Sequence, residues 1–247
     1  MIVVNGSRVV IVDDYVALSQ TAASLILNRI TQTPTTSLLV PTGTTPEGMY
    51  ALLAAQSPAT FEGVSFYNLD EYCESDTNGN YSLLGGDDSR SYQFYMNKHV
   101  LGALPSVHSF FPDVANVKQP GTYDRFIDEN GGIDLAVNAI GEDGHTFGFN
   151  LPDDALDGQT HLVTVNAGTK TVNEKLTGAT IPDYAITAGI QTGMKAREVI
   201  TLVSGSRKAE ILHKAIWDNV SAAIPATILR QHPNHTFIVD KAAAAKL

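Results

Sequence analysis

The sequence is poor in cysteine, in positive charge and in long apolar segments. Its 247 residues include a single cysteine, which excludes an intrachain disulfide or a zinc site built from several cysteines. Only 16 Lys and Arg stand against 26 Asp and Glu, a net charge of −10. This balance argues against nucleic acid as a main partner, because the phosphate backbone requires clustered cations. No apolar run approaches the ~18 residues of a transmembrane helix, so no membrane association is expected.

The first residues lack the basic segment and apolar run of a secretory signal, so we expect a soluble, cytoplasmic protein. A chain of this length can bury a full hydrophobic core. No linker divides it, so residues 1–247 are expected to form a single domain. The oligomeric state stays open at this point, and a homo-oligomer is among the expectations.

The charge is unevenly distributed along the chain. Residues 1–169 carry 20 acidic and 6 basic residues, whereas residues 170–247 carry 6 acidic and 10 basic residues. Exposed charges that lie further apart than ~8 Å are largely screened at physiological salt. Local cations therefore decide whether the protein binds an anion, and a small anionic ligand is compatible with the acidic whole.

Short apolar segments alternate with amphipathic ones. Strands are expected at 8–12, 37–40, 64–68, 133–140, 184–188, 199–204 and 236–240, with helices at 16–30, 46–55, 92–100, 123–129, 208–217 and 225–231. This alternation predicts an α/β protein with a Rossmann-like, doubly wound, mostly parallel sheet in three layers. Ligands of such sheets bind beyond the carboxyl ends of the strands, so the residues that follow each strand are the candidates for a site.

The segment after the second expected strand is suited to bind a phosphate. Thr42, Gly43, Thr44 and Thr45 combine hydroxyl groups, a flexible bend and the free N–H groups of the helix that follows. The Gly-Lys-Ser/Thr of a P-loop is missing, so an ordinary strand-to-helix turn stays an alternative. Lys208 follows another strand, where a cation in the first helical turn is unfavourable unless an anion lies nearby.

Ionisable residues follow two further strands. Asp70 and Glu71 come after strand 64–68, and only one of them is expected to enter a site, because neighbouring strand positions face opposite sides. Asp143 and His145 lie two residues apart after the next buried strand, a spacing that lets the carboxylate orient the imidazole. These residues are candidates for proton transfer, with helix caps and surface hydrogen bonds as the alternatives.

Neither a metal nor a cofactor is expected. The remaining histidines show no spacing typical of metal ligands. Cys73 is expected to be a packed thiol rather than a nucleophile.

Five segments carry a family resemblance. They are Pro-Thr-Gly-Thr-Thr-Pro at 41–46, Asn-Leu-Asp-Glu-Tyr at 68–72, Ser-Tyr at 91–92, Asp-Gly-His at 143–145 and Gly-Ser-Arg-Lys-Ala at 205–209. Their types and order resemble the glucosamine-6-phosphate deaminase/isomerase family, which shares its fold with the 6-phosphogluconolactonases. The similarity extends over most of the chain, from about residue 10 to 240.

The resemblance implies a sugar 6-phosphate as substrate and assigns roles to the candidates. The loop from Thr42 to Thr45 and Lys208 would hold the phosphate, and Asp70 would move the C2 proton. His145, oriented by Asp143, would open the pyranose ring. A ketose 6-phosphate and ammonia would form from glucosamine 6-phosphate or galactosamine 6-phosphate.

Two further residues are assigned to substrate binding through the resemblance. Glu71 belongs to the matched motif, and Lys175 takes the approximate place of an arginine that contacts the phosphate in the family. Lysine lacks the bidentate fork of arginine. His161 and Val163 stand near the positions of basic residues that bind an allosteric activator in some deaminases, so no such regulation is expected.

The sequence departs from the deaminase pattern after the histidine. Leu151 stands where the family carries a glutamate that completes a relay with this histidine, in a stretch that is one residue longer. Leucine can neither accept a proton nor orient an imidazole. Asp153 and Asp154 are the nearby candidates to replace the glutamate.

Other functions stay open for this reason. Residues 141–146 are closer to the lactonase version of the motif, in which the histidine would activate water against a lactone. Tyr72, however, stands where lactonases carry an arginine. A third hypothesis is a sugar-phosphate-binding protein with weak activity. Residues 76–91 are expected to form a mobile loop, and closure of this loop over the site is an open question.

Overall fold

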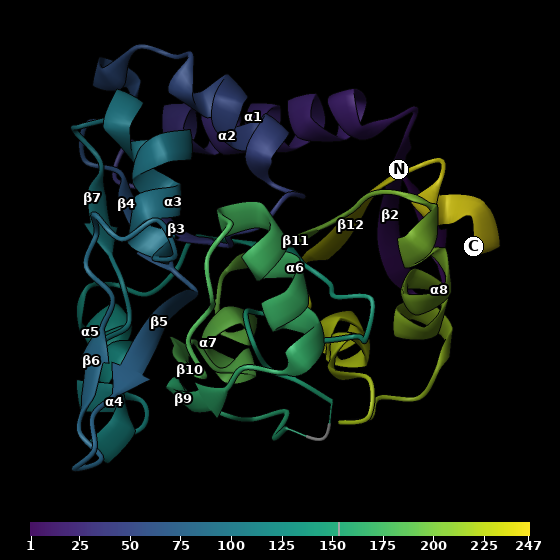
Figure 1. The fold of residues 1–247 in the computed structure, drawn as a ribbon. Helices are drawn as coiled ribbons and strands as arrows, with labels where there is room; N and C mark the ends of the chain where they lie inside the picture. Colours follow the sequence, from purple (N-terminus) through teal and green to yellow (C-terminus); the bar gives the residue numbers. More distant parts are fainter. Residues whose placement is uncertain (153) are drawn as a thin grey trace.

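A mostly parallel sheet of eight strands forms the centre of the computed structural model, which describes residues 1–152 and 154–247 (Figure 1). Every neighbouring pair in this sheet is parallel except β1 and β2. Its order is β1 (Ile2–Val4), β2 (Ser7–Val12), β12 (His235–Asp240), β11 (Glu198–Val203), β8 (Leu135–Ala139), β3 (Ser37–Val40), β4 (Ser65–Asn68) and β7 (His108–Phe110).

Helices cover both faces of this sheet and complete the expected three layers. Alternate strand residues divide between two apolar clusters, so that Leu38 and Val40 face one helical layer while Leu39 faces the other. The first layer holds α1 (Tyr15–Gln32), α2 (Glu47–Ala54) and α3 (Tyr92–His99), and the second holds α5 (Thr122–Glu129), α7 (Ile190–Met194), α8 (Ala209–Trp217) and the 3₁₀ helix η4 (Pro225–Gln231). The expected α/β fold is confirmed. Among the described helices, which also include the short α4 (Ala115–Lys118), none is long and apolar enough to cross a membrane.

A second, antiparallel sheet lies beside the first and was not expected. It consists of β6 (Tyr81–Leu83), β5 (Asp70–Ser75), β10 (Tyr184–Thr187) and β9 (His161–Thr164) in that order. The strand expected at residues 184–188 is present as β10, but it belongs to this second sheet and not to the parallel one. It pairs with β5 and packs in a separate apolar cluster around Tyr72 and Phe149.

The order of the strands creates a crevice between β3 and β8. From β3 the chain proceeds outward through β4 and β7 to one edge, and from β8 it proceeds through β11 and β12 toward the other. The loops that follow β3 and β8 therefore diverge in opposite directions. Such a switch point is where open α/β sheets bind their ligands.

Candidate active site

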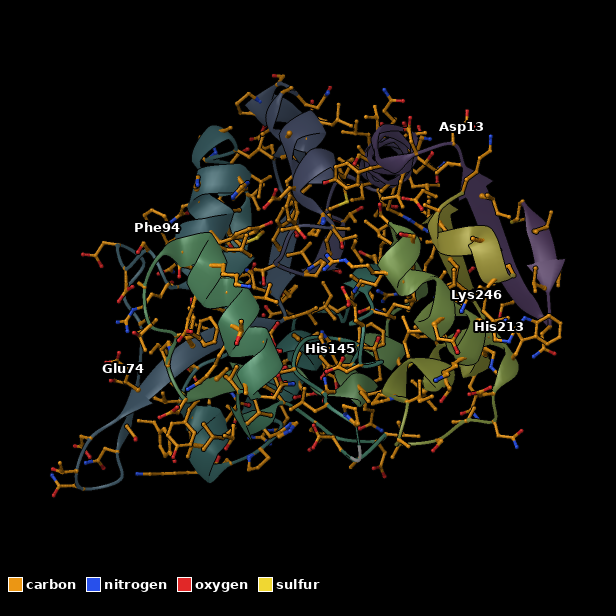
Figure 2. The ribbon with its side chains drawn as sticks, turned by 45° about the vertical axis from the view of Figure 1, so that its right-hand side comes forward. Asp13, Glu74, Phe94, His145, His213 and Lys246 are labelled. Atoms are coloured by element: carbon orange, nitrogen blue, oxygen red, sulfur yellow. The ribbon has the colours of Figure 1, made fainter. Side chains whose placement is uncertain are left out.

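A cavity of about 480 Å³ opens at this switch point. Its size is typical of a small-molecule site. Figure 2 shows His145 near the middle of the molecule, whereas Asp13 and Glu74 lie toward its edges. The loops after β3 and β8, the start of β5, the helix α6 (Ala167–Thr177) and the residues before α8 line the cavity, among them Pro41, Thr42, Gly43, Thr44, Thr45, Asp70, Tyr92, Asn138, Glu142, Asp143, His145, Phe149, Asn173, Arg207 and Lys208.

The loop after β3 is held in place through its carbonyl groups. Gly43 has φ 101°, a conformation that L side chains rarely adopt. The Tyr95 hydroxyl donates to the Gly43 carbonyl over 2.6 Å, and the Tyr15 hydroxyl donates to the Thr44 carbonyl over 3.1 Å. With these carbonyls already bonded, the hydroxyls and N–H groups of the loop are the groups that remain for a ligand.

Lys208 supplies a cation beside this loop. Its ammonium donates to the Ile140 carbonyl, and no described carboxylate lies within ion-pair distance of it. Burial lowers the pKa of Lys208, although the nearby Glu142 and Asp143 oppose this shift. A half-buried cation without a paired carboxylate is poised to bind an anion, because the anion restores the solvation that burial removes.

Asp70 is the buried carboxylate of the cavity, with 4% of its surface exposed. The Thr187 hydroxyl donates to its Oδ1 over 2.5 Å and the Phe149 N–H over 3.3 Å. Burial raises its pKa to about 7, while these two hydrogen bonds and the charge of His145 hold it from rising further. A carboxylate with a pKa near the working pH suits a general base.

Asp143 and His145 form a hydrogen-bonded pair in the cavity wall. The His145 Nδ1 lies 2.7 Å from Asp143 Oδ1, and the His145 backbone N–H donates to the same oxygen over 3.1 Å. Burial disfavours the charge of Asp143, but the hydrogen bonds and charge of His145 outweigh burial and lower its pKa to about 2. An ionised Asp143 keeps the proton of the ring on Nδ1, which leaves Nε2 free to exchange a proton with a ligand.

Glu71 lies behind the cavity wall rather than on it. Its two carboxylate oxygens accept four hydrogen bonds at 2.8–2.9 Å, from the Ser91 hydroxyl and from the N–H groups of Tyr72, Tyr92 and Gln93. Three of these donors belong to the start of α3, whose orphan N–H groups need acceptors. Glu71 therefore caps the start of α3 and is not among the residues that line the cavity, so we expect a structural role for it rather than contact with a substrate.

Glu71→Gln should destabilise the fold rather than weaken substrate binding. One oxygen would become an NH₂ group that faces two donors, at a cost of about 3 kcal/mol of unfolding free energy. Chemical denaturation measures this value. Glu74→Gln is the control, because the exposed Glu74 only pairs with Arg90 at 3.0 Å and should change stability by less than ~1 kcal/mol. A stable Glu71→Gln protein with a raised KM would show that Glu71 contributes to substrate binding and not to stability.

Other residues that the sequence suggested for the site do not line the cavity. Lys175 lies on the exposed surface of α6 and is absent from the cavity wall. Asp154 accepts a hydrogen bond from the Leu151 N–H over 2.7 Å, which caps that turn, and it is not among the residues that line the cavity. Asp153 lies outside the described residues. Residues 76–91 comprise the turn after β5, the strand β6 and the segment that leads to α3, and none of them lines the cavity.

The helix α6, which was not predicted from the sequence, lines the cavity. It contributes Asn166, Thr169, Val172, Asn173 and Leu176 to the wall. The Asn173 amide donates to the Tyr72 hydroxyl over 2.7 Å, and Tyr72 stacks on Tyr92 with ring centroids 4.7 Å apart. Two signals could have found this helix, since Asn166 caps its start and Gly178 ends it in the left-handed conformation.

Cys73 is confirmed as a packed thiol. It is fully buried on β5 between its partners on β6 and β10. Burial raises its pKa to about 12, which keeps the thiol protonated and unreactive.

Comparison with known proteins agrees on one family. The family model for glucosamine-6-phosphate isomerases/6-phosphogluconolactonase matches residues 13–238. A glucosamine-6-phosphate deaminase of Shouchella clausii is 36% identical over 96% of both chains, and that of Oceanobacillus iheyensis is 36% identical over 96% of this chain and 94% of its own.

Solved structures agree with these relatives. A structure described as a monomeric glucosamine-6-phosphate deaminase superposes with a TM-score of 0.86 at 31% identity, covering 97% of this chain and 100% of its own. A 6-phosphogluconolactonase of Trypanosoma brucei reaches a TM-score of 0.76 at 19% identity over 98% of both chains, which shows a shared fold.

Proposed function

The chain belongs to the family of glucosamine-6-phosphate isomerases and 6-phosphogluconolactonases, and we propose that it converts an amino-sugar 6-phosphate to a ketose 6-phosphate and ammonia. The observation that carries this proposal is the pairing of two separate proton-transfer groups in one cavity. Asp70 has a pKa near 7, and His145 is oriented by an ionised Asp143. Glucosamine 6-phosphate is the proposed substrate, and its galactosamine epimer is the alternative.

Two groups of cavity residues have different tasks in this proposal. The Thr42–Thr45 loop and Lys208 hold the phosphate of the substrate, and the acidic groups lie around the sugar. His145 Nε2 accepts the proton of the C1 hydroxyl and passes it to the ring oxygen, so that the bond between C1 and the ring oxygen breaks and the ring opens to an aldehyde. The C2 proton becomes acidic only after this step, because the carbonyl then accepts the electrons of the C–H bond.

Asp70 performs the step that follows. It removes the C2 proton, and the electrons shift so that a double bond forms between C1 and C2 and the aldehyde oxygen gains a proton. Return of a proton to C1 leaves an imine at C2. Water adds to this imine and ammonia leaves, so that the whole reaction consumes one water and is hydrolytic at its last step. The general acid and the general base each contribute about 10²–10⁴-fold.

Lactone hydrolysis is the second candidate, and Leu151 favours it. Without a glutamate to complete the relay, the Asp143–His145 pair alone is sufficient to activate a water against a lactone carbonyl. Lactone hydrolysis, however, has no use for a second base such as Asp70 with a pKa near 7. The lactonase structures are also the less similar ones, at 14–20% identity.

Ammonia release from glucosamine 6-phosphate tests the proposed function. We expect steady release, a several-hundred-fold lower kcat/KM for glucosamine without phosphate, and 6-phosphogluconolactone hydrolysis no faster than its spontaneous rate. Lactone hydrolysis without ammonia release would assign the protein to the second candidate. Tight binding of a sugar phosphate without turnover would contradict both.

His145→Gln should lower kcat by about 10²-fold, because the substrate would then depend on its small open-chain fraction. Asp143→Asn should cause a loss of similar size, because the amide no longer holds the ring proton on Nδ1. His213→Gln is the matched control, since the half-buried His213 lies on α8 away from His145 and contacts the Lys246 carbonyl (Figure 2). Stopped assays of ammonia formation measure all three, and an active His145→Gln enzyme would contradict the ring-opening role.

A further inference from the structure

A row of polar side chains crosses an otherwise apolar face of the main sheet and reaches the cavity at one end. It consists of His235 on β12, Thr201 on β11 and Asn138 on β8, and none of the three has more than 5% of its surface exposed. Their neighbours along the strands, including Ala136, Val199, Val203, Phe237 and Val239, belong to the apolar cluster under α5 and α8. Burial of a polar group costs free energy unless the group is hydrogen-bonded, so a row of buried polar side chains indicates a role beyond packing.

The row is connected by hydrogen bonds from strand to strand. The His235 Nε2 lies 2.9 Å from the Thr201 hydroxyl. Thr201 and Asn138 are direct partners in the parallel register of β11 and β8, and the Asn138 amide donates to the Thr201 hydroxyl over 3.3 Å. The row therefore ends at Asn138, which also lines the cavity.

Asn138 reaches from the sheet into the loop that carries the catalytic histidine. Its amide donates to the Thr146 hydroxyl over 2.7 Å, and its carbonyl oxygen accepts from the Phe147 N–H over 2.9 Å. Thr146 and Phe147 immediately follow His145. Thr146 pairs with Ile140 in an antiparallel bridge, so the loop returns onto the end of β8 beside the residue that holds it.

The held segment is strained and connects both proton-transfer groups. Phe147 has φ 49°, a left-handed conformation that a non-glycine residue keeps only when its surroundings impose it. Two residues further, the Phe149 N–H donates to Asp70. One asparagine thus fixes the backbone between the imidazole of His145 and the amide that hydrogen-bonds the general base.

We propose that Asn138 is a positioning residue for the proposed reaction. It holds residues 145–149 so that His145 stays against Asp143 and the Phe149 N–H stays against Asp70. An apolar side chain would fill the same volume on this apolar face, but it would bind neither Thr146 nor Phe147. The catalytic consequence rests on the proposed function, whereas the placement of His145 does not.

Asn138→Leu tests the proposal, because leucine keeps the volume and removes every hydrogen bond. We expect kcat to fall by about 10²-fold with KM within about threefold, as for a misplacement of catalytic groups by ~1 Å. The acid limb of the pH–rate profile should move to higher pH, because the Phe149 N–H bond that favours the charged form of Asp70 is weakened. The ¹⁵N resonances of the His145 ring should lose the signature of the Nδ1 hydrogen bond to Asp143.

A second set of variants covers the case in which Asn138→Leu does not fold. Thr146→Val removes the hydroxyl that accepts from the Asn138 amide but keeps the shape of the threonine side chain, so it should reproduce part of the loss of kcat. Thr146→Ser keeps the hydroxyl and should retain activity within about threefold. Thr201→Val breaks the row behind Asn138 but leaves both of its bonds to the loop, so its effect should be smaller than that of Thr146→Val.

Unchanged His145 resonances and an unchanged acid limb in a folded Asn138→Leu protein would overturn the proposal. Equal activities of Thr146→Val and Thr146→Ser would do the same. Failure of the proposed function has a different signature, since the wild-type protein would then release no ammonia while the ring resonances of His145 would still respond to Asn138.

Discussion

Asp70→Asn is expected to lower kcat for ammonia release by about 10³-fold, with KM within about threefold. Asparagine has the same shape, and its side-chain oxygen still accepts from Thr187 and from the Phe149 N–H. The cavity and the proposed phosphate contacts should therefore stay intact, while the group proposed to remove the C2 proton is lost. Steady-state kinetics with glucosamine 6-phosphate measures the split between kcat and KM.

The pH dependence of the wild-type enzyme provides an independent check on Asp70. A general base works only when it is deprotonated, so kcat/KM should rise tenfold per pH unit below pH ~7 and level off above it. The ordinary pKa of an aspartate would place this limb near pH 4. A profile that stays flat from pH 5 to 8 would contradict the role of Asp70.

Stability should change in the opposite direction to activity. Because burial raises the pKa of Asp70 to about 7, the folded protein binds a proton that the unfolded chain has released between pH ~4 and 7. The unfolding free energy therefore falls as the pH rises through this window, by at most about 4 kcal/mol. Asp70→Asn should be more stable than the wild type at pH 8 and equally stable at pH 4. A less stable variant at pH 8 would show that the carboxylate is not a buried charge.

Lys208→Met is expected to raise the KM for the phosphorylated substrate by about 10²-fold, since a buried charge pair in a binding site contributes several kcal/mol. Methionine keeps much of the aliphatic length of lysine and removes the ammonium group beside the Thr42–Thr45 loop. Inhibition by inorganic phosphate should weaken in parallel. Lys246→Met is the matched control, because the exposed Lys246 pairs with Glu210 outside the cavity and should leave KM unchanged.

Loss of folding does not explain such a result. The ammonium of Lys208 bonds only the Ile140 carbonyl among the described residues, and burial already disfavours its charge. Lys208→Met should therefore be as stable as the wild type or slightly more so. An unchanged KM in a folded Lys208→Met enzyme would show that the phosphate of the substrate does not bind beside Lys208.

The main sheet could be predicted from the sequence because its strands are continuous apolar runs that end in polar turns. The runs 37–40 and 133–140 locate β3 and β8, and the candidates that follow them meet in the cavity. The second sheet could not be predicted in the same way. Its β5 begins with two carboxylates, and its pairing of Asp70 with Thr187 spans more than a hundred residues.

The site shows a similar division. Alternation along an extended strand predicts that Asp70 and Glu71 face opposite sides, and only Asp70 lines the cavity. Three of the four donors to Glu71 come from the start of α3, which local spacing does not reveal. The contribution of α6 depends on how that helix folds back over the sheet, so a residue-by-residue match led to the exposed Lys175 instead of Asn173.

The most direct test of the proposed chemistry follows glucosamine 6-phosphate and 6-phosphogluconolactone in parallel by NMR with the wild-type enzyme. The proposal predicts one ammonium and one fructose 6-phosphate for each amino sugar consumed, while the lactone decays at its spontaneous rate. Asp70→Asn should produce neither product at a comparable rate. Rapid loss of the lactone beside an unchanged amino sugar would contradict the proposed deamination and leave the Asp143–His145 pair as a hydrolytic site.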